Sequence, residues 1–127
     1  MPEFQPSMDY PTGLDEFTRD YLTAMEWMDV NSDHMPEMTG DETWSAELIE
    51  KAKEDCESFQ ETNAADLAVY REKTGNSGGV DFWLTRNGHG VGFWDRGLGA
   101  VGSRLSAAAS VFNCVDVYRS DDGEICV

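Results

Sequence analysis

The sequence has 127 residues and a formal net charge of −16, because 25 acidic side chains outnumber 9 lysines and arginines. Such a surface repels nucleic acid, which argues against direct phosphate binding, and it either favours a basic protein partner or only keeps the chain soluble. No apolar run approaches the roughly 20 residues of a membrane span, and the N-terminus lacks the basic and apolar segments of a secretion signal. We therefore expect an intracellular protein that contacts no membrane.

The negative charge is concentrated in the first part of the chain. Residues 1–78 hold 19 acidic and 5 basic side chains, whereas residues 79–127 hold 6 acidic and 4 basic ones. The length predicts a single domain over 1–127. Within it we expect an irregular arm over 1–13, an acidic helical part over 14–74, and a hairpin-helix-hairpin part over 79–127.

The first predicted helix covers residues 14–28, after an arm that is rich in proline. Thr12, followed three residues later by Asp15, resembles a capping box at its start. Its apolar residues recur at spacings of three and four, which is the period of one helix face; they are Leu14, Phe17, Tyr21, Met25 and Met28.

Residues 29–42 have no periodicity and contain a proline, a glycine and several turn formers, so they predict a loop. Loops of this length are uncommon in compact domains and are either functional or mobile. His34 stands beside Asp33 there, but no third ligand is near, so a solvated loop is favoured over a metal site.

A second helix is predicted from about Thr43, with Thr39 or Asp41 as its cap. Its apolar face consists of Trp44, Leu48, Ile49, Ala52, Cys56 and Phe59. The opposite face is acidic, relieved only by Lys51 and Lys53, and comprises Glu47, Glu50, Glu54, Asp55, Glu57 and Glu61. Asn63 either lies within one long helix to about residue 73 or caps a new one. The glycines from Gly75 onward end this helical part.

A β-hairpin is predicted over Val80–Arg96. Residues 80–85 alternate in the manner of a strand, with β-branched or aromatic side chains. Asn87-Gly88 follows, and this dipeptide suits a two-residue type I′ turn because both positions need positive φ. Both faces of such a hairpin carry aromatic residues. Trp83 and Trp94 share one face, which is either covered core or a contact surface.

The last part of the chain predicts a helix over 103–112 and a second hairpin. Residues 114–118 and 123–127 alternate as strands around Ser120-Asp121-Asp122-Gly123, which is a turn signal. The element order is then α-α-β-β-α-β-β. We therefore predict an α+β fold, with two or three N-terminal helices packed on an antiparallel sheet of two hairpins.

Motifs with chemical meaning are few. Gly97, Gly99 and Gly102 match the spacing of a dinucleotide-binding loop, but they follow the second arm of a hairpin and no parallel strands are predicted, so a linker is favoured. His89 and Asp95 would lie at opposite ends of the first hairpin, about 20 Å apart. We therefore predict no catalytic residue, metal or cofactor, and we do not expect an enzyme.

The three cysteines Cys56, Cys114 and Cys126 have no metal-like spacing. In the predicted C-terminal hairpin Cys126 faces Arg119 or Val117, and not Cys114. We therefore expect free thiols in a reducing compartment.

The chain resembles a family of small, mostly uncharacterised bacteriophage proteins. The resemblance is sharpest at D-F-W-L-T-R-N-G-H-G-V-G-F-W-D-R-G-L-G (81–99) and includes F-T-R-D-Y-L (17–22) and Y-R-S-D-D-G (118–123). It covers most of the chain, and the Glu-rich second helix and the Ala-rich third depart from it. It implies a phage protein in the cytoplasm of an infected host cell, and it transfers no activity.

Two functional hypotheses follow from these patterns. In the first, the chain is an interaction protein that binds and inhibits a basic nucleic-acid-handling protein, its carboxylates standing in for phosphates. The predicted partner-binding residues are Glu47, Glu50, Glu54, Asp55, Glu57 and Glu61, with Trp83 and Trp94 as apolar anchors and Trp27 as a further candidate. In the second, a small ligand-binding domain or enzyme is centred on His89, Trp83 and Trp94. The oligomeric state is left open.

Overall fold

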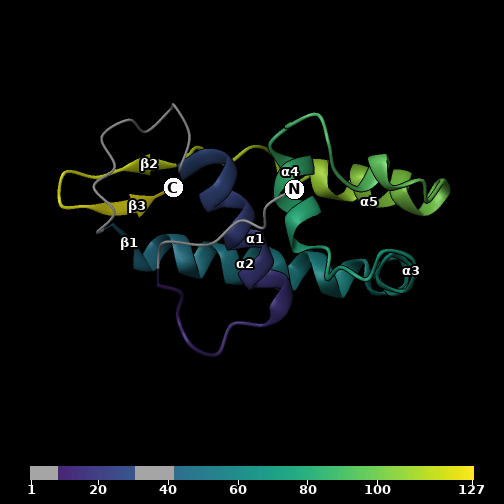
Figure 1. Ribbon diagram of the computed structural model, residues 1–127, viewed down its shortest axis with the longest axis horizontal. Coiled ribbons are helices and arrows are strands. Elements are labelled where there is room, and N and C mark those ends of the chain that lie inside the picture. Colours follow the sequence, from purple (N-terminus) through teal and green to yellow (C-terminus); the bar gives the residue numbers. More distant parts are fainter. Residues whose placement is uncertain (1–8, 31–41) are drawn as a thin grey trace.

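The computed structural model describes residues 9–30 and 42–127 (Figure 1), and these form a mostly helical α+β structure with one small sheet. The elements in chain order are α1 (Glu16–Met25), the π-helical turn η1 (Glu26–Val30), β1 (Thr43–Trp44), α2 (Ala46–Thr62), α3 (Ala64–Thr74), α4 (Gly79–Arg86), the 3₁₀ turn η2 (Phe93–Arg96), α5 (Ala100–Ser110), β2 (Tyr118–Arg119) and β3 (Glu124–Cys126). In Figure 1 the strands lie near the beginning of α2, while α3 and α5 lie toward its other end.

Helix α1 confirms the first predicted helix, with a different cap. Asp15 is the N-cap, and its carboxylate accepts a 2.9 Å hydrogen bond from the backbone N–H of Thr18. A carboxylate there satisfies an unpaired amide and also lies at the positive end of the helix dipole. The face of α1 that the sequence marked as apolar is buried, Phe17 and Tyr21 included.

Helix α2 begins three residues later than predicted, because Thr43 and Trp44 form strand β1. Ser45 is the N-cap and accepts a 3.1 Å hydrogen bond from the amide of Leu48. The predicted caps Thr39 and Asp41, like His34, lie outside the described residues. Asn63 separates α2 from α3, which is one of the two predicted alternatives. Its side-chain amide donates to the carbonyl of Phe59 at 2.9 Å, so it closes α2 without capping α3.

The predicted hairpin over 80–96 is wrong, because residues Gly79–Arg86 form helix α4. Four consecutive side chains of α4, Asp81 to Leu84, are buried. A helix buried on nearly all sides has no polar face, so its sequence does not show the helical period. The apparent alternation of residues 80–85 therefore carried no information about a strand.

The Asn87-Gly88 dipeptide ends α4 instead of turning a hairpin. The backbone N–H of Gly88 donates to the carbonyl of Thr85 at 3.2 Å. The backbone N–H of His89 donates to the carbonyl of Leu84 at 3.0 Å. These two bonds are the Schellman pattern, in which the residue after the helix cap adopts positive φ, here +67° at Gly88. A type I′ turn needs a positive φ at the same glycine, which explains why the dipeptide fitted both structures.

Close contact between α4 and α1 explains the glycine at the start of α4. A Cβ atom built at Gly79 would lie 2.0 Å from the carbonyl oxygen of Phe17, so only glycine allows the two helices to approach this closely. Phe82 of α4 stacks on Phe59 of α2 with ring centroids 4.3 Å apart, at the centre of the core. Core and glycine together fix α4 against α1, with Phe82 reaching Phe59 of α2.

The second arm of the predicted hairpin forms no strand either. Residues 93–96 make the 3₁₀ turn η2, whose Phe93 is buried and packs edge-on against Tyr70, 5.2 Å away. A Cβ at Gly102 would lie 2.9 Å from the Phe93 carbonyl, so this glycine allows α5 to pack on η2. The Gly97, Gly99 and Gly102 pattern thus follows a 3₁₀ turn, and α5 begins three residues before the predicted helix.

The sheet is mixed, not the predicted pair of antiparallel hairpins. The C-terminal hairpin is confirmed in a shorter form, with β2 antiparallel to β3 and Tyr118 opposite Cys126. Strand β1 pairs with β3 in parallel, Trp44 opposite Ile125, which gives the order β1-β3-β2. Cys56, Cys114 and Cys126 are free thiols, as expected, but Cys126 lies opposite Tyr118 and not opposite Arg119 or Val117.

Candidate functional site

Five glutamates form a straight row along the outer face of α2. They are spaced by three and four residues, and each is exposed; we call Glu47, Glu50, Glu54, Glu57 and Glu61 the glutamate row. Residues with this spacing lie on one face of a helix, and at 1.5 Å per residue the row is about 21 Å long. The opposite face of α2 carries the buried residues Leu48, Ala52, Cys56 and Phe59.

No lysine or arginine forms an ion pair with the glutamate row in the described part of the chain, which contains all nine of these cations. The four arginines of the second half are engaged with other carboxylates, in the pairs Arg86–Asp55, Arg96–Asp81, Arg104–Asp66 and Arg119–Glu42. Lys51 of α2 pairs with Asp55. The negative charge of the row is therefore left available to another molecule.

Asp55 lies on α2 but does not belong to this row. Its carboxylate accepts a 2.8 Å hydrogen bond from Arg86, whose side chain is only 1% exposed, and it lies 3.3 Å from the Lys51 ammonium. Removing one partner of such a buried pair leaves an uncompensated charge, which is strongly unfavourable. Asp55 was predicted to bind a partner, whereas its carboxylate is engaged by Arg86 and Lys51.

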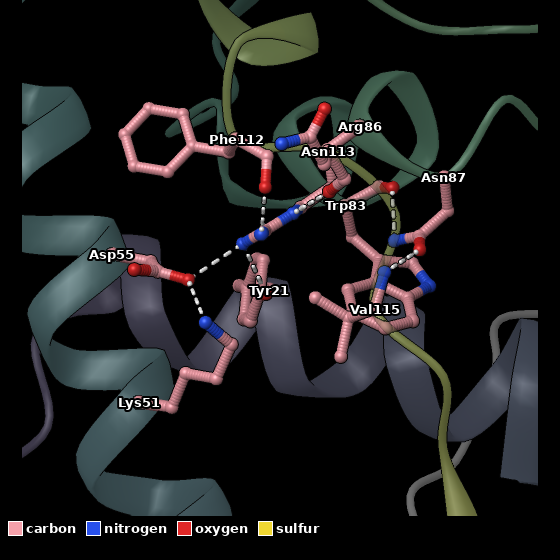
Figure 2. A network of polar contacts seen from close by, with 9 residues as sticks. All are labelled: Tyr21, Lys51, Asp55, Trp83, Arg86, Asn87, Phe112, Asn113 and Val115. Carbon is pink, nitrogen blue, oxygen red and sulfur yellow. Dashed lines mark hydrogen bonds and ion pairs between the residues drawn. The ribbon is translucent and has the colours of Figure 1, made fainter. Parts of the chain in front are cut away.

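The guanidinium of Arg86 joins three elements (Figure 2). Besides Asp55 it donates to the Tyr21 hydroxyl at 3.1 Å, and to the backbone carbonyls of Phe112 and Asn113 at 2.8 and 2.9 Å. Burial is the largest cause that raises the pKa of Tyr21, so its phenol stays protonated. Arg86 thereby ties α4 to α1, to α2 and to the segment that follows α5.

The two predicted tryptophan anchors have different environments. Trp83 is completely buried in α4, where its Nε1–H donates to Asp29 at 2.6 Å and its ring meets Tyr21 edge-on at 5.2 Å. It is therefore core, and it offers no surface to a partner. Trp94 in η2 is 55% exposed and can contact another molecule. Trp27 is 42% exposed.

His89 approaches Asp29, not Asp95. Its Nε2 lies 3.1 Å from the Asp29 Oδ2 atom that also accepts the Trp83 hydrogen bond, so the pair links the end of α4 to η1. Among the hydrogen bonds of residues 9–30 and 42–127, none joins the His89 ring to a serine, threonine or cysteine. In the same residues no three His, Cys, Asp or Glu side chains lie where they could hold a metal ion.

A second buried charge, at Asp81, was not predicted from the sequence. This carboxylate is 1% exposed and accepts two hydrogen bonds from Arg96, at 2.6 and 2.9 Å, and a third from Tyr70 at 2.5 Å. The bonds to Asp81 raise the pKa of Arg96. A pocket of about 240 Å³ adjoins the cluster. Because Asp81 and Arg96 already satisfy one another, we assign the cluster a structural role.

No protein-family model matches this chain, and neither a curated protein nor a solved structure matches it. The resemblance to small bacteriophage proteins therefore stays a prediction. None of the helices in the described residues is long and apolar enough to cross a membrane.

Proposed function

We propose that this chain is a small acidic interaction protein of phage type that binds and inhibits a basic, nucleic-acid-handling protein in the cytoplasm of the host cell. The observation that carries the proposal is the glutamate row, an exposed line of five carboxylates without a cationic partner in the described residues. A basic groove that accepts a nucleic-acid backbone would attract this line by the same electrostatics.

The spacing of the charges supports this comparison with a nucleic-acid strand. Phosphates of B-DNA follow one another every 3.4 Å of helix axis along each strand. The row presents one carboxylate for every 3.5 residues on average, which is about 5 Å of helix rise. The row is thus a sparser line of charge than one DNA strand, but it is straight and of similar order in density.

Charge alone gives a fast and salt-sensitive association, so a specific partner also requires apolar contacts. Trp94 is our candidate for such a contact, because more than half of its surface is exposed. Trp83 is excluded by its burial. The alternative of a ligand-binding or catalytic site at His89, Trp83 and Trp94 is not favoured, since the hairpin that would have joined them is a helix and a loop.

The test compares two variants with the same change in net charge. The row variant carries Glu50→Gln, Glu54→Gln, Glu57→Gln and Glu61→Gln. The control variant carries Asp9→Asn, Glu72→Gln, Asp95→Asn and Asp121→Asn, which are exposed carboxylates outside α2. Each immobilised protein is incubated with bacterial lysate. Captured proteins are then purified and tested for binding to a labelled DNA duplex with and without the wild-type chain.

We expect the wild type and the control to capture a DNA-binding protein and to displace it from the duplex. The row variant should fail in both assays. Binding should weaken about tenfold or more between roughly 50 and 200 mM salt, as expected when several ionic contacts are made. Equal capture by the row variant, or a partner that leaves the duplex undisturbed, would contradict the proposal.

A further inference from the structure

A shallow groove of about 480 Å³ opens beside the first turns of α2. Its lining residues are Glu47 and Lys51 of α2, and Cys114, Val115, Asp116 and Val127 of the C-terminal segment. We call it the valine groove. One of these lining residues, Glu47, is also the first member of the glutamate row. The groove therefore begins where the glutamate row begins.

The walls of the groove are held together by the polar network of Figure 2. On one side Lys51 and Asp55 belong to α2, and Asp55 bonds to Arg86. On the other side the amide of Val115 donates to the Asn87 side chain at 2.7 Å. Because Asn87 and Arg86 are neighbours at the end of α4, both walls are fixed to one buried anchor. A preformed groove binds with less loss of conformational freedom than a surface that must first become ordered.

The chemistry of the groove selects its occupant. Val115 and Val127 supply an apolar lining, and the carboxylates of Glu47 and Asp116 lie beside it. The lining carries two carboxylates against one lysine, so the net charge at the groove is negative. A second copy of this chain, with its net charge of −16, would be repelled. A cationic segment that carries an aliphatic side chain is complementary to both the lining and the charge.

We propose that the valine groove binds an aliphatic side chain from a basic segment of the partner, whose flanking lysines and arginines contact Glu47 and the rest of the glutamate row. The inference rests on the proposed function, and it adds the apolar contact that charge alone does not supply. Groove and row then form one continuous surface. The groove selects among basic partners, and the row attracts them.

The test uses two fluorescent peptides of lysine, arginine and glycine, one of which has leucine in place of the central glycines. Binding to the full chain is followed by fluorescence anisotropy. We expect the leucine peptide to bind about tenfold more tightly, the lower end of what one apolar group gains in a pocket. This advantage should disappear in the double variant Val115→Ser, Val127→Ser. It should persist in the matched control Val69→Ser, Val111→Ser, which changes exposed valines elsewhere.

A second readout needs no substitution. Cys114 lines the groove and is exposed, whereas Cys126 is half-buried and does not line it. The leucine peptide should slow the alkylation of Cys114 by iodoacetamide more than the glycine peptide does, with Cys126 as the internal reference. This measurement also decides the case if the double valine variant does not fold.

The outcomes separate the two proposals. If both peptides bind equally, or leave the Cys114 rate unchanged, the valine groove is not the apolar contact. If the row variant binds both peptides as tightly as the wild type, the glutamate row is not the binding surface. The row variant could lose binding of both peptides while the double valine variant keeps the full leucine advantage. That result would overturn the groove and support the row. Failure of both peptides to bind the wild type would overturn both proposals.

Discussion

Helices α2 and α4 use charged side chains in opposite ways. On α2 the five members of the glutamate row are exposed, and none forms an ion pair with a lysine or arginine of the described residues. On α4 Asp81 and Arg86 are 1% and 4% exposed, and each is paired with a group from another element. Because a buried charge requires a partner, the α4 charges fix how the helices pack. The α2 charges contribute little to packing, which leaves them free for interaction with another molecule.

The strongest test of this contrast is Arg86→Leu. The substitution leaves the Asp55 carboxylate, the Tyr21 hydroxyl and two backbone carbonyls without their donor. We expect the free energy of unfolding, measured by urea titration, to fall by about 3–5 kcal/mol. Arg104→Leu is the matched control, because Arg104 pairs with Asp66 on the surface and should matter far less. Equal losses in the two variants would contradict the structural role of Arg86.

An intermediate effect is expected at Asp15, the N-cap of α1. Burial alone would raise the pKa of Asp15, but hydrogen bonds from Thr18 and Gln60 together hold it below its ordinary value of 3.8. A carboxyl whose pKa is lowered by folding stabilises the fold above the unfolded pKa, and this contribution is lost as the pH falls through the folded pKa. Asp15→Ala should therefore cost about 1 kcal/mol at neutral pH and less in acid.

Urea titrations of the wild type and Asp15→Ala over a pH series would measure this difference. Comparing the two proteins at each pH removes the contribution of the other carboxyl groups. Asp15→Asn serves as a control, since it keeps a capping oxygen but cannot ionise. A cost that is constant from neutral to acid pH would show that the charge of Asp15 is not involved.

The smallest effect on stability is expected for the row variant. Glu50 and Glu54, and Glu57 and Glu61, are like charges four residues apart, which destabilise a helix by about 0.2–0.5 kcal/mol per pair. Their replacement by glutamine should leave the stability unchanged or raise it by up to about 1 kcal/mol. The gain should shrink as salt screens the repulsion. Thermal unfolding at low and high salt measures it, and a clear loss of stability would mean that the row helps to hold the fold.

The parts of the fold that were predictable from the sequence are the elements with one face exposed to solvent and the other buried. The period of α2 identified its buried side and all five members of the glutamate row, because exposed and buried residues alternate with the helical turn. The C-terminal turn at Ser120–Gly123 was also predictable, since its residue types favour a turn conformation of the backbone. Where water contacts one side of an element, the pattern of polar residues records its geometry.

The rest could not be read locally because it depends on contacts between distant residues. Helix α4 is buried, so its sequence does not distinguish a helix from a strand. In the sequence Asp55 cannot be distinguished from the exposed glutamates of α2, because its partner Arg86 lies 31 positions later. Trp83 is core because α1 covers it, and the parallel pairing of β1 with β3 joins Thr43 to Glu124, 81 positions apart.

The central position of β3 in the sheet also constrains the order in which parts of the protein can fold during synthesis. Ile125 lies between Trp44 of β1 and Arg119 of β2, so the sheet cannot form on a growing polypeptide until residues 124–126 have been synthesised. Contacts this distant in sequence are slow to close. We expect the acidic helix to be accessible on the nascent chain well before the valine groove beside it is complete.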